Sequence, residues 1–144
     1  MTVSTEPDLA TRLRLAITRT ARRLRQEAGT DLTPSLSAAL ATVECHGPLT
    51  PSELAEIEGV RRPTATRLVA RLAAAGLVDR AGDPNDRRVS LVSISSTGSA
   101  LLHEMRMRKN AYLARRMREL PAQDVAALER AAEILEGLLE GGPR

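Results

Sequence analysis

Apolar residues recur at helical spacing along most of this chain, and the pattern is interrupted mainly at glycines and prolines. The spacing predicts a helix from Asp8 to Ala28 and a second that opens at Thr33-Pro34 and ends at Gly47. Two further helices are predicted near the other end, from about Ser96 to Arg118 and from about Ala122 to Leu139, with Ser95 or Ser96 as the cap of the longer one. The chain is therefore expected to be mainly α-helical.

The stretch between these helices, Thr50 to Ile94, begins with a shorter helical pair. Thr50 and Glu53 have the spacing of a capping box, in which the Thr50 hydroxyl accepts from the Glu53 amide and the Glu53 carboxylate reaches back to the Thr50 amide. Gly59 then allows a sharp turn into a second helix from about Arg62 to Ala75. The apolar positions expected to be buried are Leu54, Ala55 and Ile57 on the first helix, and Ala65, Leu68, Val69, Leu72 and Ala75 on the second.

After Gly76 the pattern becomes extended. Leu77 to Arg80 is a short strand candidate, and Val89 to Ile94 is a stronger one because it is rich in β-branched residues. The segment Gly82 to Arg88 between them has the composition of a turn and is expected to be a loop. A hairpin that follows a helix-turn-helix is a winged helix. The predicted fold class is therefore mainly α with a small β-hairpin wing.

Helices at both ends of the chain carry apolar stripes that one subunit cannot easily bury. The stripe residues are Leu9, Leu13, Ala16, Ile17, Thr20 and Leu24 on the first helix, Leu101, Leu102, Met105, Tyr112, Leu113 and Met117 on the fifth, and Val125, Leu128, Ala132, Leu135 and Leu139 on the last. A two-fold homodimer with interdigitated terminal helices would bury them, and the alternative is a helical cap folded onto its own subunit. We therefore expect dimerisation segments at residues 1–33 and 96–144, and a winged helix-turn-helix at residues 34–95, within one compact subunit.

The positive charge is concentrated in the winged-helix stretch. The chain has a net charge of only +3, but residues 61–88 contain seven arginines against three aspartates. A solvated arginine-rich surface is the simpler interpretation, since all but one of the basic residues are arginine. Coincidence with a helix-turn-helix and wing instead favours binding of double-stranded DNA. The candidate DNA-binding residues are Arg61, Arg62, Thr64, Thr66, Arg67, Arg71, Asp86, Arg87 and Arg88.

Two roles are expected among these residues. The start and middle of the second helix, including Arg67, would reach base edges in the major groove. Arg88 would enter the minor groove, while Asp86 holds its guanidinium in place.

Other chemistry finds little support in the sequence. There is no glycine-rich phosphate loop or Ser-His-Asp ordering, so we expect neither an enzyme nor a cofactor. Cys45 beside His46 offers too few ligands for a metal site, and Cys45 is expected to be a small buried apolar residue. No apolar run of about 18 residues predicts a membrane span, and no secretory signal is visible. A cytoplasmic protein is expected.

The segment Asp83 to Gly98, together with the order of elements, resembles the MarR family of bacterial transcription regulators. That family has an Asp-x-Arg wing motif, then an apolar strand and a Leu-Thr-x-x-Gly-like helix start, which correspond here to Asp86-Arg87-Arg88 and Ile94-Ser95-Ser96-Thr97-Gly98. Gly76-Leu77-Val78-Asp79-Arg80 is similar to the family's Gly-Leu-(Val/Ile)-x-Arg. The resemblance covers almost the whole chain.

The resemblance implies a repressor that acts as a homodimer on a pseudo-palindromic operator and is released by a small phenolic or organic-anion ligand. Two departures matter. Arg61-Arg62-Pro63 replaces a frequent Ser or Thr cap with positive charge, and Cys45 and Tyr112 do not fit the pattern of peroxide-sensing relatives. The alternative function is a winged-helix protein-interaction module without ligand control, which would have an apolar recognition face, whereas this one is basic.

Overall fold

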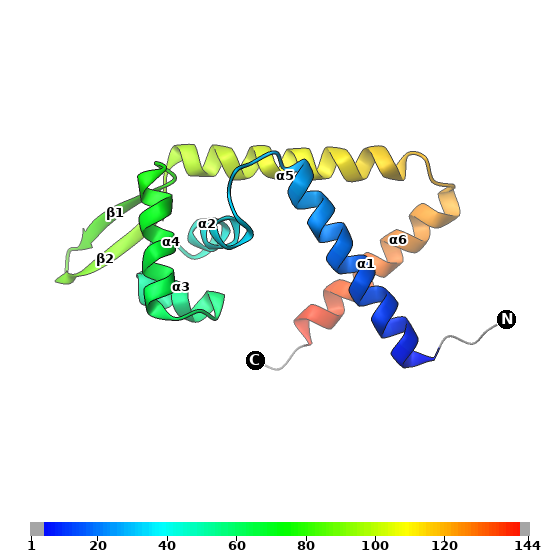
Figure 1. Cartoon of the computed structure of the whole chain (residues 1–144), viewed down its shortest axis with the longest axis horizontal. Helices are drawn as coiled ribbons and strands as arrows, with labels where there is room; N and C mark the ends of the chain where they lie inside the picture. The colour runs from blue at the N-terminus through cyan, green and yellow to red at the C-terminus, as the bar shows by residue number, and fades with distance from the viewer. Residues whose placement is uncertain (1–4, 142–144) are drawn as a thin grey trace. The chain divides into compact units, whose positions relative to one another are not determined.

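The computed structural model describes residues 5–141, which form six helices and one two-stranded hairpin (Figure 1). In chain order the elements are α1 (Glu6–Glu27), α2 (Pro34–His46), α3 (Pro51–Glu58), α4 (Arg62–Ala74), β1 (Val78–Asp83), β2 (Asp86–Ile94), α5 (Ser96–Met117) and α6 (Ala122–Glu140). The predicted fold class, mainly α with a hairpin wing, is confirmed. Described residues up to 109 form one compact unit, and those from 110 onward form a second.

Helix starts and ends follow from the residues at their boundaries. The Thr33 hydroxyl accepts from the Leu36 amide at 3.2 Å, and the Thr50 hydroxyl accepts from the Glu53 amide at 3.1 Å. The Glu53 carboxylate does not reach back to the main chain as a full capping box requires, because its Oε1 accepts from the Thr50 hydroxyl at 3.2 Å. Gly59 ends α3 with a φ of 66°, a conformation that favours glycine and permits the tight turn into α4.

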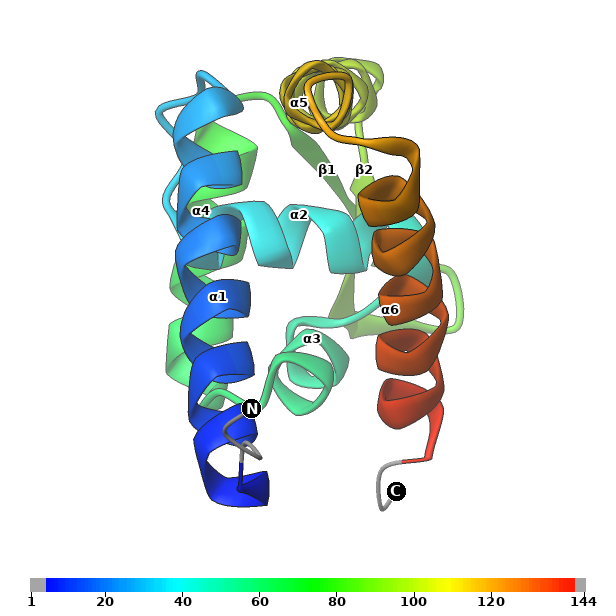
Figure 2. The same ribbon diagram turned by 90° about the vertical axis from the view of Figure 1, so that its right-hand side faces the viewer.

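The core of the first unit lies between α2, α3, α4 and the base of the hairpin. Figure 1 shows these elements grouped together, and Figure 2 shows α2 lying above α3. The largest fully buried side chains are all aliphatic: Leu40, Leu49, Leu54, Leu72, Val43, Val69 and Val92. Among the described residues no polar or charged side chain is buried. Helix α2 thus acts as the centre against which the helix-turn-helix is held.

The base of the wing is fixed to the start of α5. The Ser95 hydroxyl donates to the Gly76 carbonyl at 2.6 Å and accepts from the Gly98 amide at 3.0 Å, so it joins the end of α4 to the first turn of α5. Gly98 is in close contact with the chain, since a Cβ atom there would lie 2.1 Å from the Leu77 carbonyl oxygen. Leu49 and Val92 exchange two main-chain hydrogen bonds at 3.0 and 2.8 Å, which anchor β2 to the segment before α3.

Several expectations were wrong in detail. The hairpin is longer than predicted: β1 reaches Asp83 and β2 begins at Asp86, so only Pro84 and Asn85 remain between strands where a loop from Gly82 to Arg88 was expected. The strands stay paired in this segment, and the register shifts between Gly82 and Asp83 at a β-bulge or similar irregularity.

Three residues expected to be buried are exposed: Ile57, Ala75 and Cys45. Ile57 lies at the end of a two-turn helix, whose inward side is already filled by Leu54 and Ala55. Ala75 follows the last residue of α4. Cys45 lies in the last turn of α2, on the side of the helix opposite to Leu40 and Val43. Its exposure is therefore set by its position on the helix and not by its apolar character.

The stripes of α1 and α6 are exposed or half-buried in the single chain. Neither helix contains a buried residue. On α1 the exposed fractions of Leu9, Leu13 and Ile17 lie between 42% and 48%, and on α6 Leu128 and Leu139 are 47% and 84% exposed. None of the described helices is both long and apolar enough to span a membrane.

Candidate nucleic-acid interface

Helix α4 packs against the core with one side and exposes the other side to solvent. Ala65, Val69 and Leu72 are buried, and the helix contacts α2, α3 and β1. No side chain caps the start of α4. The first turn is closed by the main chain alone, where the Arg61 carbonyl accepts from the Thr64 and Ala65 amides at 3.0 and 3.1 Å. Pro63 suits this first turn because it has no amide proton to satisfy. The start of the helix can therefore carry arginines instead of a capping hydroxyl.

The opposite side of α4 is polar and basic. Its exposed residues are Arg61, Arg62, Thr66, Arg67, Ala70 and Arg71, and Thr64 beside them is half-buried. The Thr66 hydroxyl donates to the Arg62 carbonyl at 3.0 Å, which leaves its oxygen as an outward acceptor. The Thr64 hydroxyl accepts from Nη2 of Arg67 at 3.5 Å, a long contact that leaves the other guanidinium donors of Arg67 able to bond outward.

The wing is an antiparallel ladder that brings its charged residues to the tip. Its register pairs Val78 with Ile94, Arg80 with Val92 and Asp83 with Asp86. At the turn the Asn85 amide donates to Oδ1 of Asp83 at 2.8 Å, which closes the tip locally. Because side chains alternate along a strand, Asp86 and Arg88 share one face of β2, and Arg87 is on the other.

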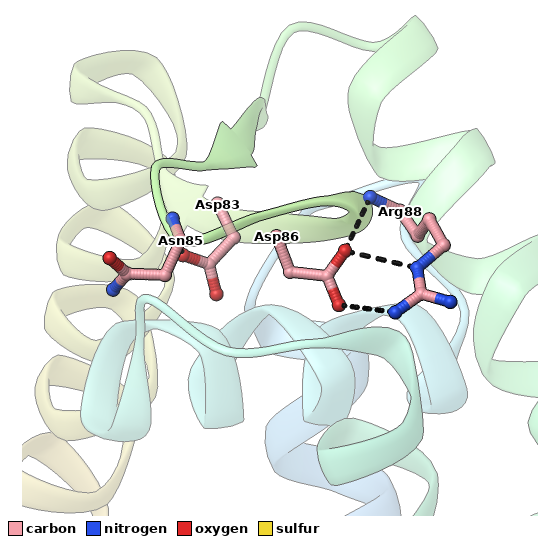
Figure 3. Close-up of polar contacts among 4 residues, drawn as sticks. All are labelled: Asp83, Asn85, Asp86 and Arg88. Atoms are coloured by element: carbon pink, nitrogen blue, oxygen red, sulfur yellow. Dashed lines mark hydrogen bonds and ion pairs between the residues drawn. The ribbon is translucent and has the colours of Figure 1, made fainter.

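Asp86 and Arg88 make a two-pronged ion pair at this tip (Figure 3). Nε of Arg88 lies 3.2 Å from Oδ1 of Asp86, Nη2 lies 3.3 Å from Oδ2, and the Arg88 amide also donates to Oδ1 at 3.0 Å. The side chain of Arg88 is nevertheless 91% exposed. The pair therefore fixes the direction of a guanidinium that remains open to solvent.

The same contacts explain the electrostatics of the carboxylate. Hydrogen bonds from the Arg88 side chain, and then from its amide, hold the pKa of Asp86 below its ordinary value of 3.8. Asp86 is thus charged at neutral pH, and its charge is directed at Arg88.

The candidate DNA-binding residues form two sets on separate elements of the first unit. Arg61, Arg62, Thr64, Thr66, Arg67 and Arg71 belong to α4 and its entrance, whereas Asp86, Arg87 and Arg88 belong to the start of β2. In Figure 1 the hairpin extends away from α4, so the two sets lie apart. This spacing fits a helix in one groove of a duplex and a wing tip in another.

Sequence reasoning missed two features of this region. Arg80, in the middle of β1, adds an exposed guanidinium to the wing, and the charge count contained the signal for it. The Thr42 hydroxyl donates to the Glu58 carboxylate and so ties α2 to the end of α3. No sequence signal marks this contact, because its partners are brought together only by the packing of two helices.

The first unit also contains a cavity of about 750 Å³ lined by α1, α2, α5 and the segment between α1 and α2. Its apolar wall includes Leu24, Leu32 and Met105, and four cationic side chains line it: Arg22, Arg25, Arg106 and Lys109. Arg106 pairs with Glu44 at 2.7 Å, whereas the other three belong to no ion pair found among the described residues. No sequence signal marks this cavity, because its lining residues are brought together only by the packing of α1, α2 and α5.

Comparison with known proteins gives a consistent result. The family model described as MarR family matches residues 32–90. An uncharacterized HTH-type transcriptional regulator of Mycobacterium bovis is 38% identical over 136 residues, which cover 94% of this chain and 95% of its own. The multiple antibiotic resistance protein MarR of Salmonella typhimurium is 32% identical over 100 residues, 69% of each chain. The crystal structure of a transcriptional regulator protein from Pseudomonas aeruginosa superposes with a TM-score of 0.84 at 32% identity, covering 99% of this chain and 100% of its own.

Proposed function

Because this chain belongs to the MarR family of transcription regulators, we propose that it is a repressor that binds a pseudo-palindromic operator as a homodimer. The observation that carries the proposal is the pairing of an exposed basic face on α4 with an oriented, exposed guanidinium at the wing tip. Both groups are cationic and exposed to solvent, and they lie on the elements that winged helices present to DNA.

In this proposal the nine candidate residues divide by element. Arg62, Thr66 and Arg67 on the exposed side of α4 contact base edges in the major groove, where a guanidinium can bond bidentately to guanine. Arg61, Arg71 and Arg87 contribute charge toward the phosphates. Thr64 supports Arg67 through its hydroxyl, and Arg88 enters the minor groove with Asp86 as its orienting partner.

The homodimer is supported by the exposed stripes. Stripe residues on both helices expose much of their surface in a single chain, which is costly for apolar groups in water: Leu9, Leu13 and Ile17 on α1, and Leu128 and Leu139 on α6. We assign dimerisation to residues 1–33 and 96–144 and DNA binding to residues 34–95. A two-fold dimer would repeat α4 and the wing at each half-site, with half-site centres about 10 base pairs apart.

The cavity beside α1 supports release by a small ligand. Its volume suits a small organic molecule, its wall is partly apolar, and Arg22, Arg25 and Lys109 would attract an anion. A ligand there would contact α1, α2 and α5 together, and α2 holds the helix-turn-helix. Binding could therefore change how α4 is presented. With no Phe or Trp in the chain, charge and aliphatic contact would dominate recognition.

The experiment is fluorescence anisotropy of the intact protein with the DNA upstream of its own gene, beside a scrambled duplex of the same composition. Specific binding with a stoichiometry of two chains per duplex is expected. Equal affinity for both duplexes at physiological salt, or a one-to-one complex, would contradict the proposal.

The ligand test adds 4-hydroxybenzoate as a probe to the preformed complex, which should release the DNA. An Arg22→Gln and Arg25→Gln double variant should keep the affinity for DNA and lose this response to the probe.

A further inference from the structure

We propose that the cavity beside α1 takes up small aldehydes that carry a carboxylate, and that Lys109 binds them covalently as an imine. This inference deepens the ligand site of the proposed function, on which it rests, by adding the chemical class of the ligand and the residue that fixes it. The reactive group is the ε-amino group of Lys109, on the part of the cavity wall that α5 supplies.

Lys109 is the single lysine of a sequence that otherwise uses arginine for its basic side chains. Where only positive charge or hydrogen-bond donors are needed, a guanidinium serves at least as well. A primary amine differs because it can lose its proton and attack a carbonyl carbon, whereas a guanidinium stays protonated in proteins. The side chain at residue 109 therefore brings to the cavity a capacity for imine formation that no other side chain of the sequence has.

The surroundings of Lys109 are of the kind in which lysines form imines. Lys109 is half-buried and lies one helical turn after the buried Met105, which lines the same cavity. Arg22 and Arg25 line the cavity from α1, and no acidic side chain is among the described residues that form its wall. Partial exclusion of water and neighbouring cations are the two conditions that make lysine amines nucleophilic in proteins.

The rest of the cavity wall indicates the class of ligand. Leu24, Leu32 and Met105 offer aliphatic contact to an apolar body. Arg22 and Arg25 offer guanidinium groups, which bind carboxylates with two parallel hydrogen bonds. The volume of about 750 Å³ accommodates a molecule the size of a substituted benzene ring. A carboxylate held by the arginines keeps the aldehyde in the same cavity as the amine, so the attack is in effect intramolecular.

The covalent step needs neither an oxidant nor a reductant. The unprotonated ε-amino nitrogen of Lys109 attacks the aldehyde carbon and forms a C–N bond, and a proton passes from nitrogen to the carbonyl oxygen to give a carbinolamine. The C–O bond then breaks as a C=N bond forms. Both hydrogens of the amine leave with the carbonyl oxygen as one water molecule, and hydrolysis reverses the reaction. The ligand is therefore held covalently but reversibly.

The test is reductive trapping in the full chain with 4-formylbenzoate, an aldehyde that carries a carboxylate. Sodium cyanoborohydride reduces the imine to a stable secondary amine, so the labelled residue gains the mass of the probe less one oxygen atom. Peptide mass spectrometry compares Lys109 with the α-amino group of the chain. An α-amino group is ordinarily the more reactive type of amine at neutral pH, because more of it is unprotonated. We expect the opposite order, with Lys109 labelled at least about tenfold faster.

Two variants show whether the cavity is responsible. The Lys109→Arg and Arg19→Lys double variant keeps the charge and moves the amine to an exposed position of α1 that does not line the cavity, where labelling should lag behind the α-amino group. The Arg22→Gln and Arg25→Gln double variant should slow labelling by 4-formylbenzoate more than labelling by benzaldehyde, because only the first has a carboxylate to bind. Circular dichroism verifies that both variants are folded.

Three results would overturn the inference. In the first, the α-amino group is labelled before Lys109 in the wild type. In the second, the relocated amine is labelled as fast as Lys109, so the cavity plays no part. In the third, the arginine variant slows both aldehydes equally, so the carboxylate is not recognised.

The probe 4-hydroxybenzoate, which cannot form an imine, separates this inference from the proposed function. It should bind in calorimetry and protect Lys109 from 4-formylbenzoate. If it binds but Lys109 of the unprotected protein is not labelled, the imine is refuted and the anion site stands. If it neither binds nor protects, the anion site of the proposed function is itself refuted.

Discussion

The carboxylate of Asp86 accepts three hydrogen bonds from Arg88, from its amide at 3.0 Å, from Nε at 3.2 Å and from Nη2 at 3.3 Å. On a wing proposed to face DNA, an acidic side chain is otherwise unfavourable, because it would repel phosphate. The arrangement resolves this difficulty by using the charge of Asp86 to direct the guanidinium of Arg88.

Replacement of Asp86 by Asn separates orientation from charge. Removing a negative charge should raise affinity for DNA if repulsion dominates, but Asn has a single acceptor oxygen and cannot hold the guanidinium by both prongs. We therefore expect the affinity for DNA to fall in anisotropy titrations. Asp83→Asn is the matched control, because it makes the same charge change at the same tip without touching Arg88. If both variants strengthened binding equally, Asp86 would have no orienting role.

The pKa of Asp86 should respond to removal of its partner. Hydrogen bonds from Arg88 depress this pKa below 3.8, so the ion pair supports the folded wing above that ordinary value and loses its contribution as pH falls through the lower folded-state value. In Arg88→Ala the side-chain hydrogen bonds are lost and only the amide bond remains, so the pKa of Asp86 should rise toward its ordinary value in NMR spectra of the Asp86 side chain. A titration midpoint unchanged between the two proteins would contradict the hydrogen-bond explanation.

Arg67 and Arg88 should differ in what they recognise. Arg67→Ala should cost about 1–3 kcal/mol on the preferred duplex and relax preference at one base position per half-site. Arg88→Ala should weaken binding to all sequences and make the salt dependence shallower by about one unit per wing, because the minor groove offers a degenerate pattern. Anisotropy with base-substituted duplexes over a salt series measures both. An Arg67→Ala loss equal for every duplex, with Arg88→Ala at wild-type affinity, would reverse the assignment.

Gly98 should not tolerate a methyl group. An Ala side chain there would place Cβ 2.1 Å from the Leu77 carbonyl oxygen, a main-chain atom that cannot move without shifting the wing base. We expect Gly98→Ala to lower the free energy of unfolding by about 2 kcal/mol or more. Gly137→Ala in α6 is the control, because no atom lies within 4 Å of its added Cβ, and it should be neutral or stabilise by about 0.5–1 kcal/mol. Thermal unfolding of both variants measures the difference.

Cys45 should be accessible but not regulatory. Its exposure means that a maleimide should label the folded protein without denaturant. It is the single cysteine of the chain, so no second thiol can resolve an oxidised form within one subunit. Cys45→Ser should therefore bind DNA with wild-type affinity, before and after peroxide treatment. A peroxide response that disappears in Cys45→Ser would show that Cys45 is a switch.

Local chemistry explains why so much of the fold could be predicted. Thr33, Thr50 and Ser95 each cap the helix expected of them, and Gly59 and Gly76 take positive φ where a helix had to end. These interactions span four residues or fewer, so the sequence contains both partners. The Asp86–Arg88 pair was predictable for the same reason, since its partners are two residues apart on one strand.

Burial followed the sequence less closely. The periodicity of α1 and α6 identified their apolar stripes but not what covers them, because periodicity is identical for a core helix and for one that needs a partner. Ile57 and Cys45 are exposed because no neighbouring helix covers the sides of α3 and α2 on which they lie, and the local pattern does not show where those neighbours end.

The sequence by itself determined the order of elements, the basic stretch from Arg61 to Arg88 and the family to which the chain belongs, because capping, amphipathicity and charge are properties of neighbouring residues. Only the tertiary structure decided that the hairpin continues to Asp83 and Asp86, that Ser95 and Gly98 fasten the wing to α5, and that Arg22, Arg25 and Lys109 line one cavity. Each of these depends on distances between residues far apart in the chain, which packing fixes and local pattern does not encode.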